Sequence, residues 1–200
     1  MIHLYKKELS IFFSTIIGPL IIGLFLLINS LLLWTSSPFS ILENSYASLN
    51  SFFEISPIIF LLFIPAIGMR TFSEEYNTGT IETLKTKPLS NKHIVFGKYL
   101  SILTLVALSL LPTLLYVITI YFIGETIGNL DLAGIAGSYI GIFMLSSIFT
   151  SISVFSSSLS NNQIIAFILA IILSSLFYFG FDLLSNIAIL EPINLVLKRT

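Results

Sequence analysis

Five long apolar runs constrain this sequence more than any other feature. They cover residues 12–35, 49–69, 94–123, 132–155 and 164–184. As helices rising about 1.5 Å per residue, runs of this length can cross the roughly 30 Å hydrocarbon core of a bilayer. The runs are continuous rather than alternating, which favours helices over a barrel. Because 56% of the residues are hydrophobic and only 10% are charged, we predict an all-α, polytopic membrane protein with five spans in one domain.

The basic residues indicate an orientation. They precede the first run or lie between the second and third, as Lys6, Lys7, Arg70, Lys85, Lys87, Lys92 and Lys98. The positive-inside rule therefore predicts a cytoplasmic N-terminus. Lys198 and Arg199 break the pattern, because a tail after five spans would lie outside. We interpret them as a sign that a sixth span follows Thr200, with a long external segment as the alternative.

Residues that could carry catalysis are sparse. The chain has no cysteine, which excludes thiolate nucleophiles and Cys-ligated metals. His3 and His93 are isolated in sequence, and we interpret His93 as an interfacial side chain. The sequence Gly-Lys-Tyr at 97–99 is not a phosphate-binding loop, because Lys92 replaces its first glycine and Tyr99 its Ser/Thr. We predict no enzyme activity, no metal or cofactor in this chain, and no nucleic-acid partner.

The fourth run contains two features of low specificity. Gly134, Gly137 and Gly141 predict a small-residue packing face, within one chain or between protomers. The serine-rich stretch 146–163 can bend a helix through bonds to the preceding turn, or line a polar pathway. Glu54, the one acid inside the second run, lies near its outer end and is interpreted as interfacial rather than as an ion relay.

The polar segment 70–93 connects the second and third runs. Arg70 and Glu74 have the i, i+4 spacing of a surface ion pair. Ser90 has the position of an N-cap for the third run. Lys98 lies about two turns further along, and we expect its side chain to extend back to the aqueous surface.

Within this segment the sequence predicts a short helix. Gly79 sets a turn, Thr80 is the expected N-cap, and Glu82 lies in the first turn, where an acid suits the helix dipole. Ile81 and Leu84 form an apolar face. So short a helix is marginal in water, so this face must rest on the membrane interface or in a groove of a partner protein.

The stretch EEYNTGTIETLKTKPLSNKHIVFGKYL, residues 74–100, resembles the signature of the type-2 ABC-transporter permeases. The matching residues are Glu75, Gly79, Thr80, Ile81, Glu82, Leu84, Pro88, Leu89, Ser90, Ile94, Val95, Gly97, Lys98 and Tyr99. The serine-rich turn and following span at 156–169 are also similar to this family. The N-terminal part is most similar to gliding-motility-associated permease subunits of the GldF type.

The resemblance implies a function. Such permeases normally have six spans, work as homodimers or heterodimers in the bacterial inner membrane, and export a cargo using a separate cytoplasmic ATPase that holds ATP and magnesium. Segment 70–93 would contain the coupling helix that docks on that ATPase. The residues implied in this contact are Phe72, Glu75, Gly79, Thr80, Ile81, Glu82 and Leu84. A role in gliding motility is implied as well, but the cargo is not readable from the sequence.

Two other classes of function stay open at this point. A membrane scaffold or assembly factor could use segment 70–93 to bind a partner that is not an ATPase. An ion-coupled secondary transporter would use ionisable residues near the middle of the bilayer. The apolar runs contain no such acid, and this argues against an ion-coupled secondary transporter.

Overall fold

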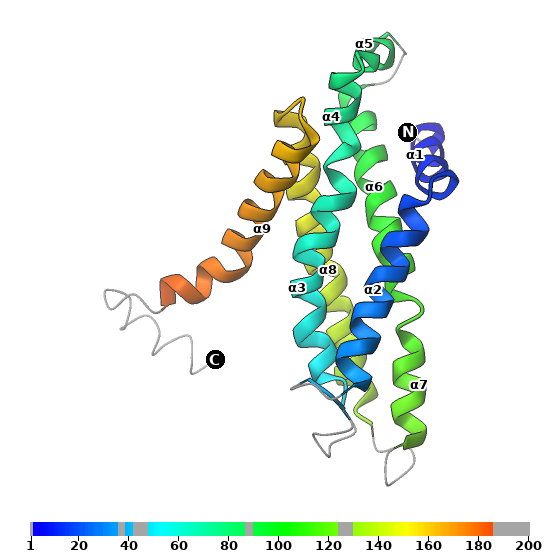
Figure 1. Cartoon of the computed structure of the whole chain (residues 1–200), viewed down its shortest axis with the longest axis vertical. Coiled ribbons are helices and arrows are strands. Elements are labelled where there is room, and N and C mark those ends of the chain that lie inside the picture. Colours follow the sequence, from blue (N-terminus) through cyan, green and yellow to red (C-terminus); the bar gives the residue numbers. More distant parts are fainter. Residues whose placement is uncertain (1, 36–38, 42–47, 87–89, 124–129, 186–200) are drawn as a thin grey trace.

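The computed structural model describes residues 2–35, 39–41, 48–86, 90–123 and 130–185, and these form helices and turns without a strand (Figure 1). The helices are α1 Ile2–Ser14, α2 Ile17–Trp34, α3 Asn50–Gly68, α4 Arg70–Asn77, α5 Thr80–Lys85, α6 Asn91–Leu110, α7 Leu114–Ile123, α8 Leu132–Leu159 and α9 Gln163–Ser185. Within these described ranges, five helical stretches are long and apolar enough to cross a membrane. The predicted polytopic, all-α fold with five spans is confirmed.

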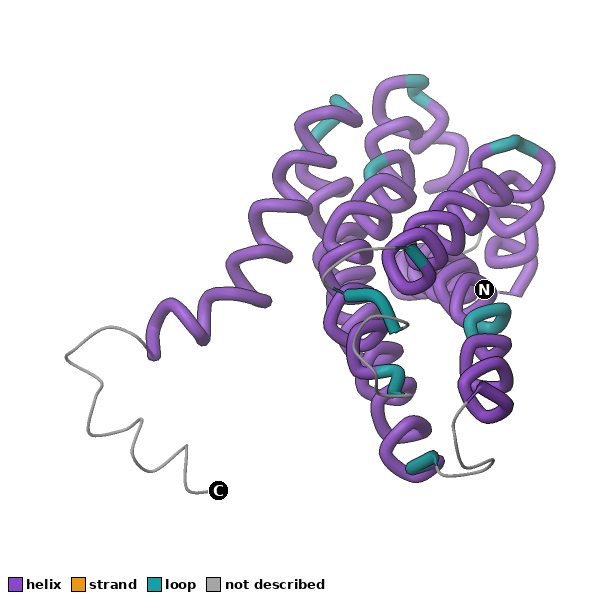
Figure 2. The backbone as a smooth tube through the Cα atoms, turned by 60° about the horizontal axis from the view of Figure 1, so that its bottom comes forward, coloured by secondary structure: helices purple, strands orange, loops and turns teal. Residues whose placement is uncertain are grey.

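Helix α3 is the centre of the bundle. It packs most extensively against α8 and also contacts α2, α6 and α9. Helix α6 lies between α1, α2 and α8. Helix α9 follows α8 at one end and then diverges from the bundle, as Figures 1 and 2 both show. Its contact side is a stripe of small, fully buried residues, Ala166, Ala170 and Ser174, which lets helix backbones approach closely.

The first span begins at Ile17 rather than at Phe12, so the predicted start is wrong. The residues before it form the separate helix α1. A Cβ on Gly18 would lie 2.6 Å from the Phe12 carbonyl oxygen, so the sharp elbow between α1 and α2 depends on glycine. Pro19 adds to the break, because it lacks the N–H that would bond to the Thr15 carbonyl in a continuous helix.

The third span is two helices rather than the single predicted run 94–123. Helix α6 ends at Leu110 and α7 begins at Leu114. Pro112 lies in the turn between them, where it cannot continue the hydrogen-bond ladder. The N-terminal end of α6 agrees with the prediction, since the Ser90 hydroxyl oxygen accepts a hydrogen bond from the His93 N–H at 3.4 Å.

The serine-rich stretch ends α8 and starts α9. Helix α8 continues four residues past the predicted end at residue 155. In the turn that follows, the Ser160 hydroxyl accepts from the Asn162 N–H at 3.0 Å. The Asn162 side-chain oxygen then accepts from the Ile164 N–H at 2.9 Å. These side chains replace the backbone partners that helix termini lack.

One end of the bundle gathers α1, α4, α5, the start of α6 and the α8–α9 turn (Figure 1). We call it the basic end, because Lys6, Lys7, Arg70, Lys92 and Lys98 belong to these elements. The structure thus brings together the basic segments that the charge rule assigned to one side. Lys198 and Arg199, on which the expectation of a sixth span rests, lie outside the described residues.

Candidate docking site at the basic end

Helices α4 and α5 form an arm that extends beyond the rest of the bundle (Figure 1). The arm continues α3 after a break at Met69. At this break the Ser157 hydroxyl of α8 accepts from the Phe72 N–H at 2.9 Å and from the Ser73 N–H at 3.2 Å. The same hydroxyl donates to the Met69 carbonyl at 2.8 Å. A side chain from α8 therefore bonds to the backbone groups at the base of the arm.

Close approach of α3 and α8 makes these bonds possible. A Cβ on Gly68 would lie 2.1 Å from the Ser153 hydroxyl oxygen and 2.8 Å from the Ser153 Cβ. No side chain fits at that distance without a shift of one helix. Glycine at 68 and a small residue at 153 therefore set the separation at which Ser157 meets the base of the arm.

The outer part of the arm is a tight turn followed by α5. Gly79 has φ of 71°, a left-handed conformation that glycine adopts without strain, as the predicted turn requires. The prediction that Thr80 caps α5 is wrong, because Gly79 occupies the N-cap position and no side-chain cap bond forms. The Thr80 hydroxyl instead pairs with that of Thr78 at 2.9 Å. Glu82 lies in the first turn, as predicted.

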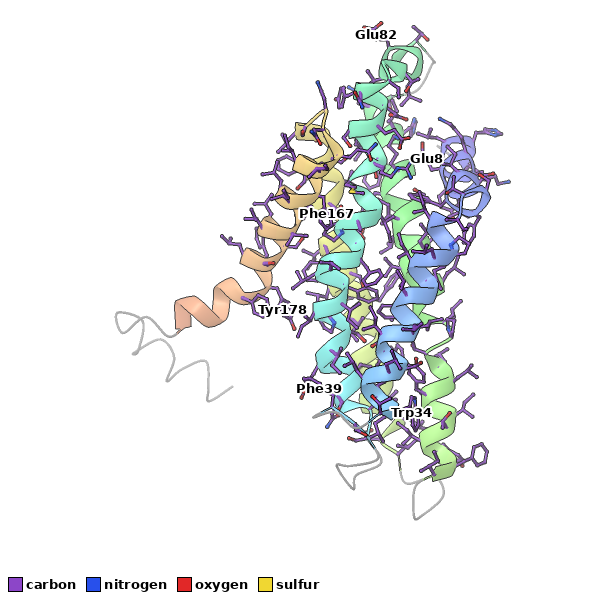
Figure 3. All side chains as sticks on the ribbon, in the orientation of Figure 1. Glu8, Trp34, Phe39, Glu82, Phe167 and Tyr178 are labelled. Atoms are coloured by element: carbon purple, nitrogen blue, oxygen red, sulfur yellow. The ribbon has the colours of Figure 1, made fainter. Side chains whose placement is uncertain are left out.

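The residues predicted to contact a partner divide into two sets. The inward set is covered by this chain: Phe72 is buried at 7% exposed, Leu84 is buried at 5% exposed, and the Glu75 side chain is half-buried at 15% exposed. The outward set, Gly79, Thr80 and Glu82, is exposed, and Ile81 is half-buried. Figure 3 shows Glu82 at the outer tip of the arm. The inward set is therefore covered within this chain, and the outward set is exposed at the tip of the arm.

Lys98 is buried beneath the arm, so the expectation that it extends to the surface is wrong. Its side chain is 1% exposed. The ammonium group donates to the Thr71 carbonyl at 2.6 Å, to Glu75 Oε1 at 2.8 Å and to Glu8 Oε1 at 3.2 Å. These four residues are the Lys98 cluster. All three ammonium donors have an acceptor, which is the condition for burying such a charge.

Residues 97–99, the Gly-Lys-Tyr sequence that is not a phosphate-binding loop, are part of α6 and join it to three other helices. Gly97 lies against Leu4 of α1, which would be 3.3 Å from a Cβ at this position. Lys98 joins α1 and the arm. The Tyr99 hydroxyl hydrogen-bonds to the Ser147 hydroxyl of α8 at 2.8 Å. Consecutive residues point in different directions on a helix, so this short sequence fixes α6 to its neighbours.

Two further predictions concern surface features. Arg70 and Glu74 form the expected ion pair through two hydrogen bonds of 2.9 and 3.0 Å; both side chains are partly exposed, so the pair stabilises the arm only slightly. Gly137 and Gly141 lie on an exposed face of α8, where an added Cβ would meet nothing within 4 Å. Gly134 adjoins the Asp131 side chain, which caps α8. Packing of this glycine face between protomers stays a prediction.

Sequence reasoning missed the Lys98 cluster and the Ser157 contact. A signal existed for the first, since Lys98 stands in an apolar run and Glu8 is the one acid before the first span. No signal distinguished Ser157 from its neighbouring serines. Among the described residues, no group of three or more His, Asp and Glu side chains could hold a metal ion. The contacts at the basic end thus hold the arm in position, and the molecule is a polytopic helical membrane protein with an arm that extends beyond its bundle.

Comparison with known proteins identifies the family. The profile of the ABC-2 family transporter proteins matches residues 26–195, so the chain belongs to this family. The matched range includes the arm, Lys98 and Ser157. Searches of curated proteins and of solved structures found no match.

Family membership defines the general role. The chain is a multi-pass membrane component of an ABC transporter, and the family's membrane component is not itself the ATPase. The family also implies a partner ATPase subunit in the transporter.

Proposed function

We propose that this chain is the permease subunit of an ATP-driven exporter and that the tip of its arm docks on the cytoplasmic ATPase subunit. The observation that carries the proposal is the contrast within the arm. Its base is fixed by Lys98 and Ser157, whereas Glu82 at its tip is exposed beyond the bundle (Figure 3). A short helix of this kind is marginal in water, and a groove on a partner would stabilise it.

The contacts at the base suggest how movement would spread. A displacement of the arm pulls on Ser157, and so on α8. It also pulls on Lys98, and so on α6 and, through Glu8, on α1. The bonds of Lys98 to the two carboxylates are charged and therefore short and directional, and the neutral Ser157 hydroxyl bonds to three backbone groups of the arm base. These helices would therefore move together with the arm. ATP and magnesium would be bound in the partner subunit, and this chain would supply only the mechanical connection.

The remaining parts of the proposal concern the assembly and its setting. The transporter would contain two permeases, identical or different, and two ATPase subunits in a bacterial inner membrane, with the basic end in the cytoplasm. The position of the basic residues supports that orientation. Lys6 and Lys92 belong to elements at the same end of the bundle, and cytoplasmic loops of membrane proteins are generally rich in Lys and Arg. The likeness of the N-terminal part to GldF-type permeases supports a role in gliding motility, for which a deletion strain is the test.

A charge reversal at the tip tests the docking proposal. Glu82→Lys changes an exposed side chain, whereas Glu54→Lys makes the same change at an exposed site near the opposite end of the bundle. We expect Glu82→Lys to abolish co-purification with the ATPase subunit and stimulation of ATP hydrolysis, because it places a reversed charge in the interface. Glu54→Lys should leave both unchanged.

Three outcomes would reject the proposal. If Glu82→Lys retains association and stimulation, the tip does not dock on the ATPase. If the ATPase associates with the normal chain but its activity is indifferent to that association, a scaffold is the better description. Transport that continues without ATP and stops when an ion gradient is dissipated would replace the exporter with a secondary transporter.

A further inference from the structure

The basic end contains a cavity of about 710 Å³ between the arm, α6 and α8. It lies on the α8 side of the arm, whereas the Lys98 cluster lies on the α1 side. Pockets that bind small ligands commonly have volumes of about 300–1,000 Å³. The cavity is therefore large enough for a ligand, and none of the contacts described above uses it.

The walls of the cavity are apolar and reach the membrane-facing surface. Phe72, Ile94 and Val154 form buried parts of the wall. Phe96 and Phe155 form its rim, and more than half of each side chain is exposed. Both rim residues belong to helices that are long and apolar enough to span a membrane. In a chain whose α6 and α8 span the membrane, an apolar cavity with such a rim would open toward the hydrocarbon of the bilayer.

The mouth of the cavity at the basic end is polar and favours a negative charge. Asn91 in the first turn of α6 and Tyr76 of α4 line the cavity. Lys92 and His93, which follow Asn91 in the chain, are exposed. No acidic side chain lines the cavity among the described residues, and Glu82 is exposed next to the lining residue Ile81. The first turn of α6 adds the partial positive charge of a helix N-terminus. The charges at this mouth therefore complement an anionic headgroup attached to an apolar chain.

We propose that this cavity binds one anionic phospholipid of the cytoplasmic leaflet. An acyl chain occupies the space between α6 and α8, and the phosphate lies at the mouth beside Lys92. Burial of the acyl chain against the aromatic walls supplies non-directional stabilisation. The lipid would then support the arm on the side where the protein leaves it uncovered. Phe72 and Ile81 line this cavity and are also among the residues implied in ATPase contact, so the test includes a measurement that separates a lipid from a docked protein.

Photo-crosslinking in liposomes tests the site. The full chain is reconstituted in phosphatidylcholine with a trace of phosphatidylglycerol that carries a diazirine on its acyl chain. We expect labelling at residues 94–99 and 151–158. Ser151→Trp should reduce it to the level on lipid-facing residues of α2, because the exposed Ser151 lines the cavity and an indole would fill it. Ile148→Trp, on the same helix and 51% exposed, is the control that leaves the cavity open.

The headgroup is tested separately. Lys92→Gln should lower the preference for phosphatidylglycerol over a matched phosphatidylcholine probe about fivefold, as expected for loss of one basic residue near an anionic lipid. The exposed Lys6 is the control, and Lys6→Gln should leave the preference unchanged.

Ser158→Trp provides a second variant that fills the cavity if Ser151→Trp does not fold.

Three results would overturn the proposal. Equal labelling in Ser151→Trp, Ser158→Trp and Ile148→Trp would show that the cavity is not the site. Equal labelling by the two probes would refute the anionic preference. Loss of labelling when the ATPase subunit is bound without nucleotide would identify the cavity as part of a protein-docking surface instead.

Discussion

The two sides of the arm are held by different chemistry. On the α1 side, the buried Lys98 ammonium joins α1, α4 and α6 through charged hydrogen bonds. On the α8 side, the neutral Ser157 hydroxyl holds the base of the arm, and an apolar cavity lies beside it. A buried charge tolerates little displacement from its partners, whereas an apolar surface can slide or exchange its occupant. The arm therefore has a fixed side, which faces α1, and an adaptable side, which faces α8.

The largest effect should come from the fixed side. Lys98→Met leaves Glu8 and Glu75 without their cation, and the Glu75 Oε2 atom is already buried without a hydrogen-bond partner among the described residues. Removal of one member of a buried ion pair typically lowers the free energy of unfolding by about 3–5 kcal/mol. We expect a loss of this size in denaturation by SDS in mixed micelles.

Two comparisons control this prediction. Lys92→Met alters an exposed lysine of the same helix and should change stability by less than about 0.5 kcal/mol. The triple variant Lys98→Met, Glu8→Gln, Glu75→Gln removes the unpaired charges and should be more stable than Lys98→Met alone. Equal stability of Lys98→Met and Lys92→Met would contradict the fixed-side description.

The next largest effect should come from the α8 side. Ser157→Ala removes the acceptor of the Phe72 and Ser73 N–H groups. Buried donors left without a partner destabilise a fold, and we expect a loss of about 2–3 kcal/mol in the same assay. The neighbouring Ser158 is exposed and bonds only to its own helix, so Ser158→Ala should be nearly neutral. An equal loss in both variants would argue against a specific role for Ser157.

A smaller effect is expected where α3 and α8 meet. Gly68→Ala introduces a Cβ that overlaps Ser153, and overpacking offset by better helix propensity should destabilise the fold by about 1–2 kcal/mol. Adding Ser153→Gly should recover part of this loss in a double-mutant cycle. Additive effects of the two changes would show that the helices do not depend on this close contact.

The smallest effect should come from the glycine face of α8. A Cβ at Gly137 meets nothing within 4 Å, so Gly137→Ala should not destabilise a single chain and should stabilise it by up to about 1 kcal/mol through better helix propensity. The second measurement is self-association of the chain, followed by crosslinking in liposomes. Weaker association would place the glycine face between protomers, and a large loss of single-chain stability would contradict the exposed position of this face.

The predictable part of the site consists of local features. Gly79, Glu82 and the Arg70–Glu74 pair depend on neighbours within a few residues, so their positions could be predicted from spacing. Lys98 could not, because its partners lie 90 and 23 residues away in the chain. The small-residue stripes show the same limit. Gly137 matched a packing pattern but is exposed, whereas Ala170 is fully buried against the bundle.

The sequence by itself determined the class of this protein and the end at which its polar residues gather. Apolar runs of membrane-spanning length permit few folds, because backbone groups in hydrocarbon must be bonded within helices. Only the tertiary structure decided that α1 is a separate helix, that Phe72 supports the arm from inside, and that Lys98 is buried. Those outcomes depend on which distant side chains come into contact. A lysine ammonium with three acceptors can be buried, whereas one without partners is placed in water.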